Sequence, residues 1–364
     1  MKIGILTFHS AHNYGAVLQA YATKEFLKGL GYDANIIDYR PGYIKDEYEV
    51  KYTFKGNLIK LPLRFIKYFI LRHSRKRRFN KFEIFINDIL NPVSSELSIP
   101  ADLDVYVVGS DQIWNPKITK GFDRVFFVDF NFQKRNKVYI SYAASMETSN
   151  LTSKESKFLA ESLNRFDSIS VREYELLKLL QPLINKEIYK VLDPTFLLTA
   201  NRWKELAKIK RNDSKYVLVY QVREDSRTIK IAKQIASQLE AKIVQLVAWV
   251  SLSNFVDSTV AHDASPEEFL GYIKNAECVV TTSFHGTAFS VIFQKNFYYV
   301  ALKDGKNTRA SSLLNSINLE NRMIDIDSRP TFTTIDYKDS EILLNEQIDR
   351  SSEFLKMALS KFKN

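Results

Sequence analysis

The 364-residue chain has one cysteine, Cys278, and five histidines, so it has little of the residue types that form disulfides and zinc sites. A single thiol excludes a disulfide-bonded secreted scaffold, and no CxxC motif or Cys/His metal spacing is present. No apolar run approaches the roughly 20 residues that a membrane span needs. The start, MKIGILTFHS, leads into a strand-like pattern instead of a cleavable signal. We therefore expect a soluble cytoplasmic protein without a metal site, and the length predicts two domains.

Positive charge is concentrated in one segment. The chain carries 52 Lys and Arg against 42 Asp and Glu, a net charge of +10. Residues 50–82 contain eleven Lys or Arg and no acid, so the other residues, with 41 basic and 42 acidic side chains, have a net charge of −1. Apolar side chains interleave with the basic ones, which is typical of a helix that binds anionic lipid headgroups. A solvated helical face is the alternative, and no recognisable nucleic-acid module accompanies the segment.

We therefore expect residues 50–82 to bind an anionic membrane surface. The protein would then be peripheral on the inner face of the membrane. No binding to nucleic acid is expected.

Strand-length apolar runs alternate with helical patterns along the chain. A strand at Ile3–Phe8, a helix at Tyr14–Leu30 and a strand at Ala34–Asp38 open one series, and Tyr216–Val222 opens a second. This alternation predicts parallel α/β sheets. We predict two domains, residues 1–207 with a basic helical insertion at about 50–90 and residues 208–338, followed by an amphipathic helix at 339–364. A ligand is expected in the cleft, at the carboxyl ends of the strands.

Two of the loops that follow strands each precede a helix. In the loop at residues 9–15, free backbone N–H groups at the helix start would attract an anion, although Asn13 in a simple capping role is the alternative. No GxGxxG or GxxxxGK[ST] motif is present, so dinucleotide and P-loop nucleotide binding are not supported. In the loop at residues 281–287, His285 would enter the cleft beside three hydroxyl residues. A histidine there can handle a proton next to a bound anion.

Two other loops carry different chemistry. Asp111, Trp114 and Asn115 follow Gly109-Ser110 and suit a sugar, because carboxylate and amide groups pair with hydroxyls and an indole face packs on C–H groups. The alternative is an Asp-capped turn with the indole in the core. Arg172 ends a strand and is placed to clamp a phosphate or carboxylate, or else to pair with a neighbouring acid.

The four loops, taken in this order, resemble the polysaccharide pyruvyl transferase family. The matching pieces are KIGILTFHSAHNYGAVLQAYA, VGSDQIWNP, SVRE, LDPTF, and TTSFHGTAFS with TRASSLL after it. Family members are similar to glycosyltransferases of the GT-B type, with the last helix often crossing back to the first domain. The resemblance therefore implies an α/β protein with two Rossmann-like domains in a GT-B-like arrangement and a cleft between them.

The resemblance also implies an activity. Family members transfer the enolpyruvyl carbons of phosphoenolpyruvate to two hydroxyls of a sugar, forming a cyclic pyruvate ketal and releasing phosphate. We expect phosphoenolpyruvate as donor substrate, no cofactor, and an acceptor glycan carried on polyprenyl diphosphate. Such chemistry serves the synthesis of surface polysaccharides such as capsule.

Site roles follow from the resemblance and from the loops together. The expected catalytic residues are His285 as general acid, Arg172 at the anion and Asp111 at the acceptor hydroxyl. Acceptor binding is expected from Ser110, Trp114 and Asn115, and donor binding from Asn13, Gly15, Ser283, Gly286, Arg223 and Arg309. Better-characterised members carry Arg two positions before the histidine, where this chain has Ser283. Arg223 or Arg309 would then have to supply the missing charge.

Two other functions stay open from the sequence. The same two-domain cleft would serve a GT-B-type glycosyltransferase that uses a nucleotide sugar. A catalytically inactive relative that binds the membrane surface is favoured by Ser283 in place of arginine.

Overall fold

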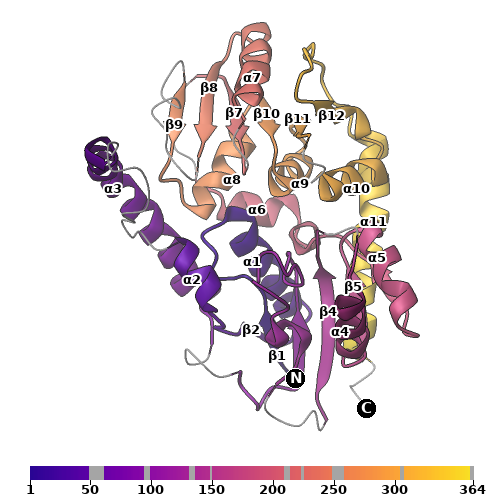
Figure 1. Cartoon of the computed structure of the whole chain (residues 1–364). Coiled ribbons are helices and arrows are strands. Elements are labelled where there is room, and N and C mark those ends of the chain that lie inside the picture. Colours follow the sequence, from indigo (N-terminus) through magenta and orange to yellow (C-terminus); the bar gives the residue numbers. More distant parts are fainter. Residues whose placement is uncertain are drawn as a thin grey trace.

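The computed structural model describes residues 1–48, 61–93, 99–130, 136–147, 150–208, 214–222, 225–247, 258–303 and 307–360. For residues 46–48 and 61–72 it describes the backbone alone. The described chain forms two parallel six-stranded sheets, one from each half of the sequence (Figure 1).

The first sheet has the strand order β2-β1-β3-β4-β5-β6, and every neighbouring pair is parallel. Its strands are β1 (Lys2–Leu6), β2 (Asp33–Ile36), β3 (Val105–Val108), β4 (Val138–Ala144), β5 (Ser168–Val171) and β6 (Ile188–Lys190). The central strands are buried along their whole length, because helices cover both faces of a parallel sheet. This burial is why they appear in the sequence as continuous apolar runs.

The second sheet has the order β12-β11-β10-β7-β8-β9 and is also parallel throughout. Its strands are β7 (Tyr216–Tyr220), β8 (Lys242–Leu246), β9 (Thr259–Ala261), β10 (Cys278–Thr281), β11 (Asn296–Ala301) and β12 (Met323–Asp325). Each domain is thus a doubly wound α/β unit.

The helices lie between and beside these strands. They are α1 (Tyr14–Gly29), α2 (Gly42–Tyr48), α3 (Leu61–Ile84), α4 (Ser153–Leu163), α5 (Tyr174–Leu180), α6 (Ala200–Leu206), α7 (Ser226–Gln238), α8 (Pro266–Asn275), α9 (Phe284–Ile292), α10 (Thr308–Ser316) and α11 (Lys338–Ser360). Short turns of other helix types are η2 (Phe85–Leu90), η3 (Arg124–Phe127), η4 (Gln181–Leu183), η5 (Pro194–Leu197) and η7 (Glu320–Arg322). Two helix starts carry a full capping box, Thr152 with Glu155 and Ser265 with Glu268.

The predicted fold class, α/β with two Rossmann-like domains, is confirmed. The sequence pattern missed two strands, β9 and β12, which have three residues each and lie at opposite edges of the second sheet. Their burial patterns include exposed positions, because an edge strand has a neighbour on one side only. Such short, partly exposed segments lack the apolar run that marks the inner strands.

The last helix, α11, packs against the first domain. In Figure 1 it runs in yellow from the second domain down beside the first. The backbone N–H of Leu192 donates to Ser351 Oγ at 2.9 Å, and the Phe354 ring lies against those of Tyr142 and Tyr189. Ser351 and Phe354 are buried by these contacts.

The basic helix α3 also connects the two domains. Arg77 Nε donates to Asp263 Oδ2 at 2.8 Å, and Lys81 Nζ donates to Glu268 Oε2 at 2.7 Å. Arg78 donates to the carbonyl oxygen of His12 at 2.9 Å. Part of the local positive charge therefore serves contacts inside the molecule. Residues 50–60 of the predicted membrane-binding segment lie outside the described residues, and in the described part no helix is long and apolar enough to span a membrane.

Candidate active site between the two domains

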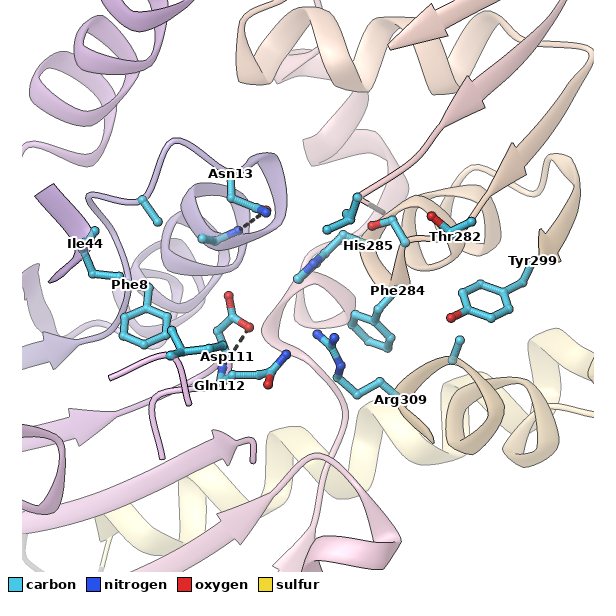
Figure 2. A pocket seen from close by; sticks show the side chains of 16 residues that line it. Phe8, Asn13, Ile44, Asp111, Gln112, Thr282, Phe284, His285, Tyr299 and Arg309 are labelled. Atoms are coloured by element: carbon cyan, nitrogen blue, oxygen red, sulfur yellow. Dashed lines mark hydrogen bonds between the residues drawn. The ribbon is translucent and has the colours of Figure 1, made fainter. Parts of the chain in front are cut away.

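A cavity of about 230 Å³ lies between the two domains, and side chains from both line it (Figure 2). Its lining residues are Phe8, Ala11, Asn13, Ala16, Ile44, Asp111, Gln112, Ile118, Val222, Thr282, Ser283, Phe284, His285, Tyr299, Arg309 and Ala310. The first eight belong to the first domain and the last eight to the second. Neither domain has this cavity by itself.

The order of the strands explains the position of the cavity. In the first sheet the direction of winding changes between β1 and β3, and in the second sheet it changes between β7 and β10. Loops that follow such strands diverge and leave a crevice at the carboxyl edge of the sheet. The segments after β1, β3, β7 and β10 all contribute to the lining. The two crevices therefore face each other across the domain interface.

His285 lies in the first turn of α9 and reaches from the second domain into the first (Figure 2). Its ring is buried, with 7% of the side chain exposed. A Cβ atom at Gly15, at the start of α1, would lie 1.9 Å from His285 Nδ1 and 2.3 Å from Cγ. No side chain fits there, so glycine at position 15 is required for the ring to sit against the α1 backbone.

Asp193 lies at the other side of the imidazole. It follows β6 in the first domain and is fully buried, and its Oδ2 is 3.6 Å from His285 Nε2. The same oxygen accepts a hydrogen bond from Arg172 Nη1 at 2.5 Å and one from Ser110 Oγ at 3.3 Å. Oδ1 accepts from the backbone N–H and the hydroxyl of Thr195, at 3.0 and 2.8 Å. One carboxylate thus connects the histidine, the arginine and the turn η5.

Arg172 is not among the residues that line the cavity, and its role at the donor anion stays a prediction. Its guanidinium is buried among three carboxylates, with Asp193 at 2.5 Å, Glu173 at 3.2 Å and Asp111 at 3.7 Å. The Phe284 ring covers the guanidinium at 4.7 Å. Nη1 and Nε are hydrogen-bonded to Asp193 and Glu173, whereas the buried Nη2 has no hydrogen-bond partner. The effect of Arg172 on the cavity passes through the carboxylates that it holds.

The charges of this cluster shift its acid–base equilibria. Burial would raise the pKa of Asp193, but the neighbouring His285 and Arg172 outweigh burial and hold that pKa well below its usual range. Burial raises the pKa of Glu173 above its ordinary value, although Arg172 and the hydroxyl of Ser145 oppose the shift. Asp193 is therefore a permanent anion beside the imidazole.

Arg309, at the start of α10, points into the cavity from the side opposite Asp111 (Figure 2). Its Nη2 lies 3.9 Å from Glu147 Oε2, and the amide oxygen of Gln112, in the orientation that satisfies both groups, accepts from Nη2 at 3.0 Å. Among the described lining residues, Arg309 is the one lysine or arginine. The predicted Arg223 lies outside the described residues.

The four predicted donor-binding residues at the helix starts have local roles as well. Asn13 Oδ1 accepts from the N–H groups of Gly15 and Ala16, and Ser283 Oγ accepts from the N–H of Gly286 at 3.3 Å. The N–H groups of Asn13 and Gly15 are thus already bonded, and Gly286 does not line the cavity. Asn13 and Ser283 line it with their side chains and cap α1 and α9 at the same time.

The three residues predicted to bind the acceptor do not line the cavity. The Trp114 indole is fully buried, stacked on Phe127, and its N–H donates to the carbonyl of Phe126. Asn115 is buried and holds its own turn, since its side chain contacts Gln112 and the N–H of Lys117. Ser110 is buried against Ala143 and Asp193. From this loop, Asp111 and Gln112 reach the cavity instead, because the turn after β3 directs its apolar residues into the core.

Sequence reasoning missed Asp193 as a site residue, although LDPTF was among the pieces that carried the family resemblance. Gln112, Phe284 and Tyr299 were also missed. An acid directly after a strand, as in Asp193-Pro194, was the available signal. Its partner His285 is 92 residues away in sequence and in the other domain, so no spacing pattern connects them.

Comparison with known proteins gives a family and a fold. A family model described as polysaccharide pyruvyl transferase matches residues 13–304. No curated protein sequence matches the chain. A structure of Methanocaldococcus jannaschii UDP-GlcNAc 2-epimerase in complex with UDP-GlcNAc and UDP is 12% identical, with a TM-score of 0.50 over 99% of this chain and 100% of that one.

Two further solved structures are similar at lower scores. The S. aureus MnaA-UDP co-structure is 12% identical, with a TM-score of 0.46 over 98% of this chain and 91% of that one. Arabidopsis thaliana UGT89C1 complexed with quercetin is 10% identical, with a TM-score of 0.41 over 100% and 95% of the two chains. At such identities the likeness concerns the fold alone, which is a GT-B-like arrangement.

Proposed function

Because the chain belongs to the polysaccharide pyruvyl transferase family, we propose that it transfers the pyruvyl carbons of phosphoenolpyruvate to two hydroxyls of a sugar in a glycan. The product is a cyclic pyruvate ketal, and phosphate is released. The observation that carries the proposal is the histidine at a small polar cavity that both domains close, with an arginine on its wall.

The donor site suits a small anion. Arg309 is the lysine or arginine of the described lining, and Thr282 and Ser283 add hydroxyls beside His285 at the start of α9. A helix start favours negative charge through its dipole. A volume of about 230 Å³ is below the ~300–1,000 Å³ of sites for drug-sized ligands, so it suits phosphoenolpyruvate better than a whole nucleotide sugar.

The chemistry needs one proton donor and one acceptor for protons. His285 gives its proton to C3 of phosphoenolpyruvate, so that positive charge develops at C2. The first sugar hydroxyl attacks C2 and returns a proton to the imidazole. The C2–O bond to phosphate then breaks, the second hydroxyl closes the ring, and its proton leaves with phosphate. Asp111, which faces the same cavity, is placed to orient the attacking hydroxyl.

Phosphate release tests this function against the nucleotide-sugar alternative. The protein is incubated with phosphoenolpyruvate and candidate lipid-linked glycans, and thermal stability is measured with phosphoenolpyruvate and with a panel of UDP- and GDP-sugars. We expect stabilisation by phosphoenolpyruvate and acceptor-dependent release of phosphate. Stabilisation by a nucleotide sugar only, with its hydrolysis or transfer, would replace the pyruvyl transferase by a glycosyltransferase.

Arg309→Gln should raise the KM for phosphoenolpyruvate about 10- to 100-fold, because a hydrogen bond to a charged group contributes about 1.5–3 kcal/mol. Glutamine keeps a donor near Gln112 but removes the charge. Steady-state kinetics at fixed acceptor concentration measures the effect. Arg329→Gln, which removes an equal charge from an exposed position, is the control and should leave KM unchanged. An unchanged KM in Arg309→Gln would assign the anion to another residue.

The acceptor is proposed to be carried on polyprenyl diphosphate, and residues 50–82 are proposed to bind the anionic membrane on which it is held. Arg77 contacts Asp263 in the second domain and Arg78 contacts His12 in the first, so replacing them would disturb these contacts as well as the charge. To test membrane binding we therefore choose the triple variant Lys51→Gln, Lys55→Gln and Lys60→Gln, which leaves Arg77 and Arg78 in place. Near an anionic surface each basic residue contributes about 1 kcal/mol.

The triple variant should lose most of its co-sedimentation with phosphatidylserine-containing vesicles at low salt. Its activity on a lipid-free acceptor should stay unchanged. The matched control removes three lysines elsewhere, Lys120, Lys204 and Lys230, which are exposed. Failure of the wild-type protein to sediment with these vesicles would end the membrane proposal and leave the catalytic proposal in place.

A further inference from the structure

We propose that Asp193 is a positioning residue that keeps a proton on Nε2 of His285, so that Nδ1 is the nitrogen that exchanges its proton with substrate. Because Asp193 belongs to the first domain and His285 to the second, the working pair exists only when the two domains are in the observed arrangement. This inference rests on the proposed function for its chemistry, but its geometry stands without it.

The carboxylate of Asp193 is held by more groups than the histidine alone. Both of its oxygens accept hydrogen bonds from its own domain, Oδ1 from Thr195 and Oδ2 from Arg172 and Ser110. The aspartate is fully buried, so water does not compete for it. Its position is therefore set before His285 arrives from the other domain.

One nitrogen of the imidazole, Nε2, faces the carboxylate of Asp193. Nε2 is buried, has no hydrogen-bond partner within 3.5 Å, and lies 3.6 Å from Asp193 Oδ2. A small approach of the two domains would bring it into hydrogen-bond range. On the other edge of the ring, Nδ1 and Cγ lie against the backbone of Gly15 at the start of α1. The ring is thus held between Asp193 and Gly15, and both belong to the first domain.

This arrangement fixes the direction of proton transfer. In the imidazolium, the Nε2 proton faces Asp193 and the Nδ1 proton is the one that can leave. When the Nδ1–H bond breaks, the proton forms the C–H bond at C3 of phosphoenolpyruvate, and the neutral ring keeps its Nε2 proton on the carboxylate. The lone pair left on Nδ1 then takes the proton of the first sugar hydroxyl. The cycle closes with the imidazolium restored.

The signs of the charges around the His285 ring fit a positioning role for Asp193. Asp193 faces it from the segment after β6, Asp111 from the segment after β3, and Arg309 from α10, while Arg172 acts on it through Asp193. Replacing Asp193 by a neutral residue therefore removes the anion that faces Nε2.

Asp193→Asn is the direct test, because asparagine has nearly the same shape but no charge. We expect the turnover number to fall at least tenfold with the KM for phosphoenolpyruvate within threefold of wild type. Thr195→Val, which removes one hydrogen bond to Asp193, should lower the turnover number by less, and Thr195→Ser should restore it.

A second readout needs no activity. In protein labelled with ¹⁵N-histidine, the His285 signals, identified by their loss in a His285→Ala variant, report which nitrogen holds the proton in the neutral ring. We expect the Nε2–H form in wild type and a mixture of both forms in Asp193→Asn. This measurement can be made even if Asp193→Asn has little activity. If Asp193→Asn does not fold, the same measurement is made on Thr195→Val.

The matched control is Asp225→Asn. Asp225 also caps a helix and pairs with an arginine, Arg227, but contacts no histidine. It should change neither the turnover number nor the His285 signals. An Nδ1–H form in wild type, or an unchanged turnover number with an unchanged tautomer in Asp193→Asn, would overturn the inference. Lack of phosphate release from phosphoenolpyruvate in wild type, with the Nε2–H form present, would instead reject the proposed function alone.

Discussion

Replacing His285 with alanine should lower the turnover number about 100-fold or more, which is the loss expected when a general acid is removed. The imidazole is the group of the described lining that can give up and regain a proton at neutral pH. Asp193 and the Gly15 backbone hold it at the wall of the cavity. Alanine at this position removes the proton donor and leaves the start of α9 capped by Ser283.

Phosphate release at saturating phosphoenolpyruvate and acceptor measures this effect, and thermal unfolding reports whether the fold persists. His73→Ala, at an exposed position on α3, is the control and should keep wild-type activity. A turnover number for His285→Ala within threefold of wild type would show that the histidine is not the acid.

Arg172→Met should destabilise the protein by about 3–5 kcal/mol, because removing one partner of a buried ion pair leaves uncompensated charge behind. Asp193 and Glu173 would each lose the guanidinium that lies 2.5 and 3.2 Å away, and both are buried. Methionine has a similar length and fills the space under Phe284. Urea unfolding at pH 7 measures the change, which should shrink at acid pH as the two carboxyl groups take up protons.

The matched control for this prediction is Arg202→Met. Arg202 also pairs with two acids, Glu25 and Glu205, but it is exposed, so its loss should cost at most about 1 kcal/mol. Arg172→Lys should recover part of the stability and little of the activity, because an ammonium lacks the planar fork that reaches Asp193 and Glu173 together. A destabilisation below 1 kcal/mol in Arg172→Met would contradict the expectation that Arg172 compensates the buried charges of Asp193 and Glu173.

The layers of the fold and the edge of each sheet that carries the site can be predicted from the amino-acid pattern alone. Buried parallel strands are continuous apolar runs, and the helices between them show one apolar face, so the alternation identified both sheets apart from the edge strands β9 and β12. Polar residues after inner strands lie at the carboxyl edge of a parallel sheet whatever the details of packing. That rule was enough to bring Asn13, Asp111, Ser283 and His285 to one cavity.

Which side chains reach the cavity, and which pack behind it, depends on contacts between segments that are distant in the sequence. Trp114 and Asp111 are three residues apart, and the turn between them sends one into the core and the other into the cavity. Arg172 is at the predicted edge, but three acids gather around it, and two of them, Asp111 and Asp193, come from other segments of the chain.

For the same reason, no local sequence pattern predicts the contact between the domains. Asp193 meets His285, and Arg77 meets Asp263, only because two independently built sheets face each other with their switch points aligned. Local sequence fixes where each strand ends, since that depends on neighbouring residues. It does not fix which residue of a second domain will lie opposite, because that choice depends on packing across the whole interface.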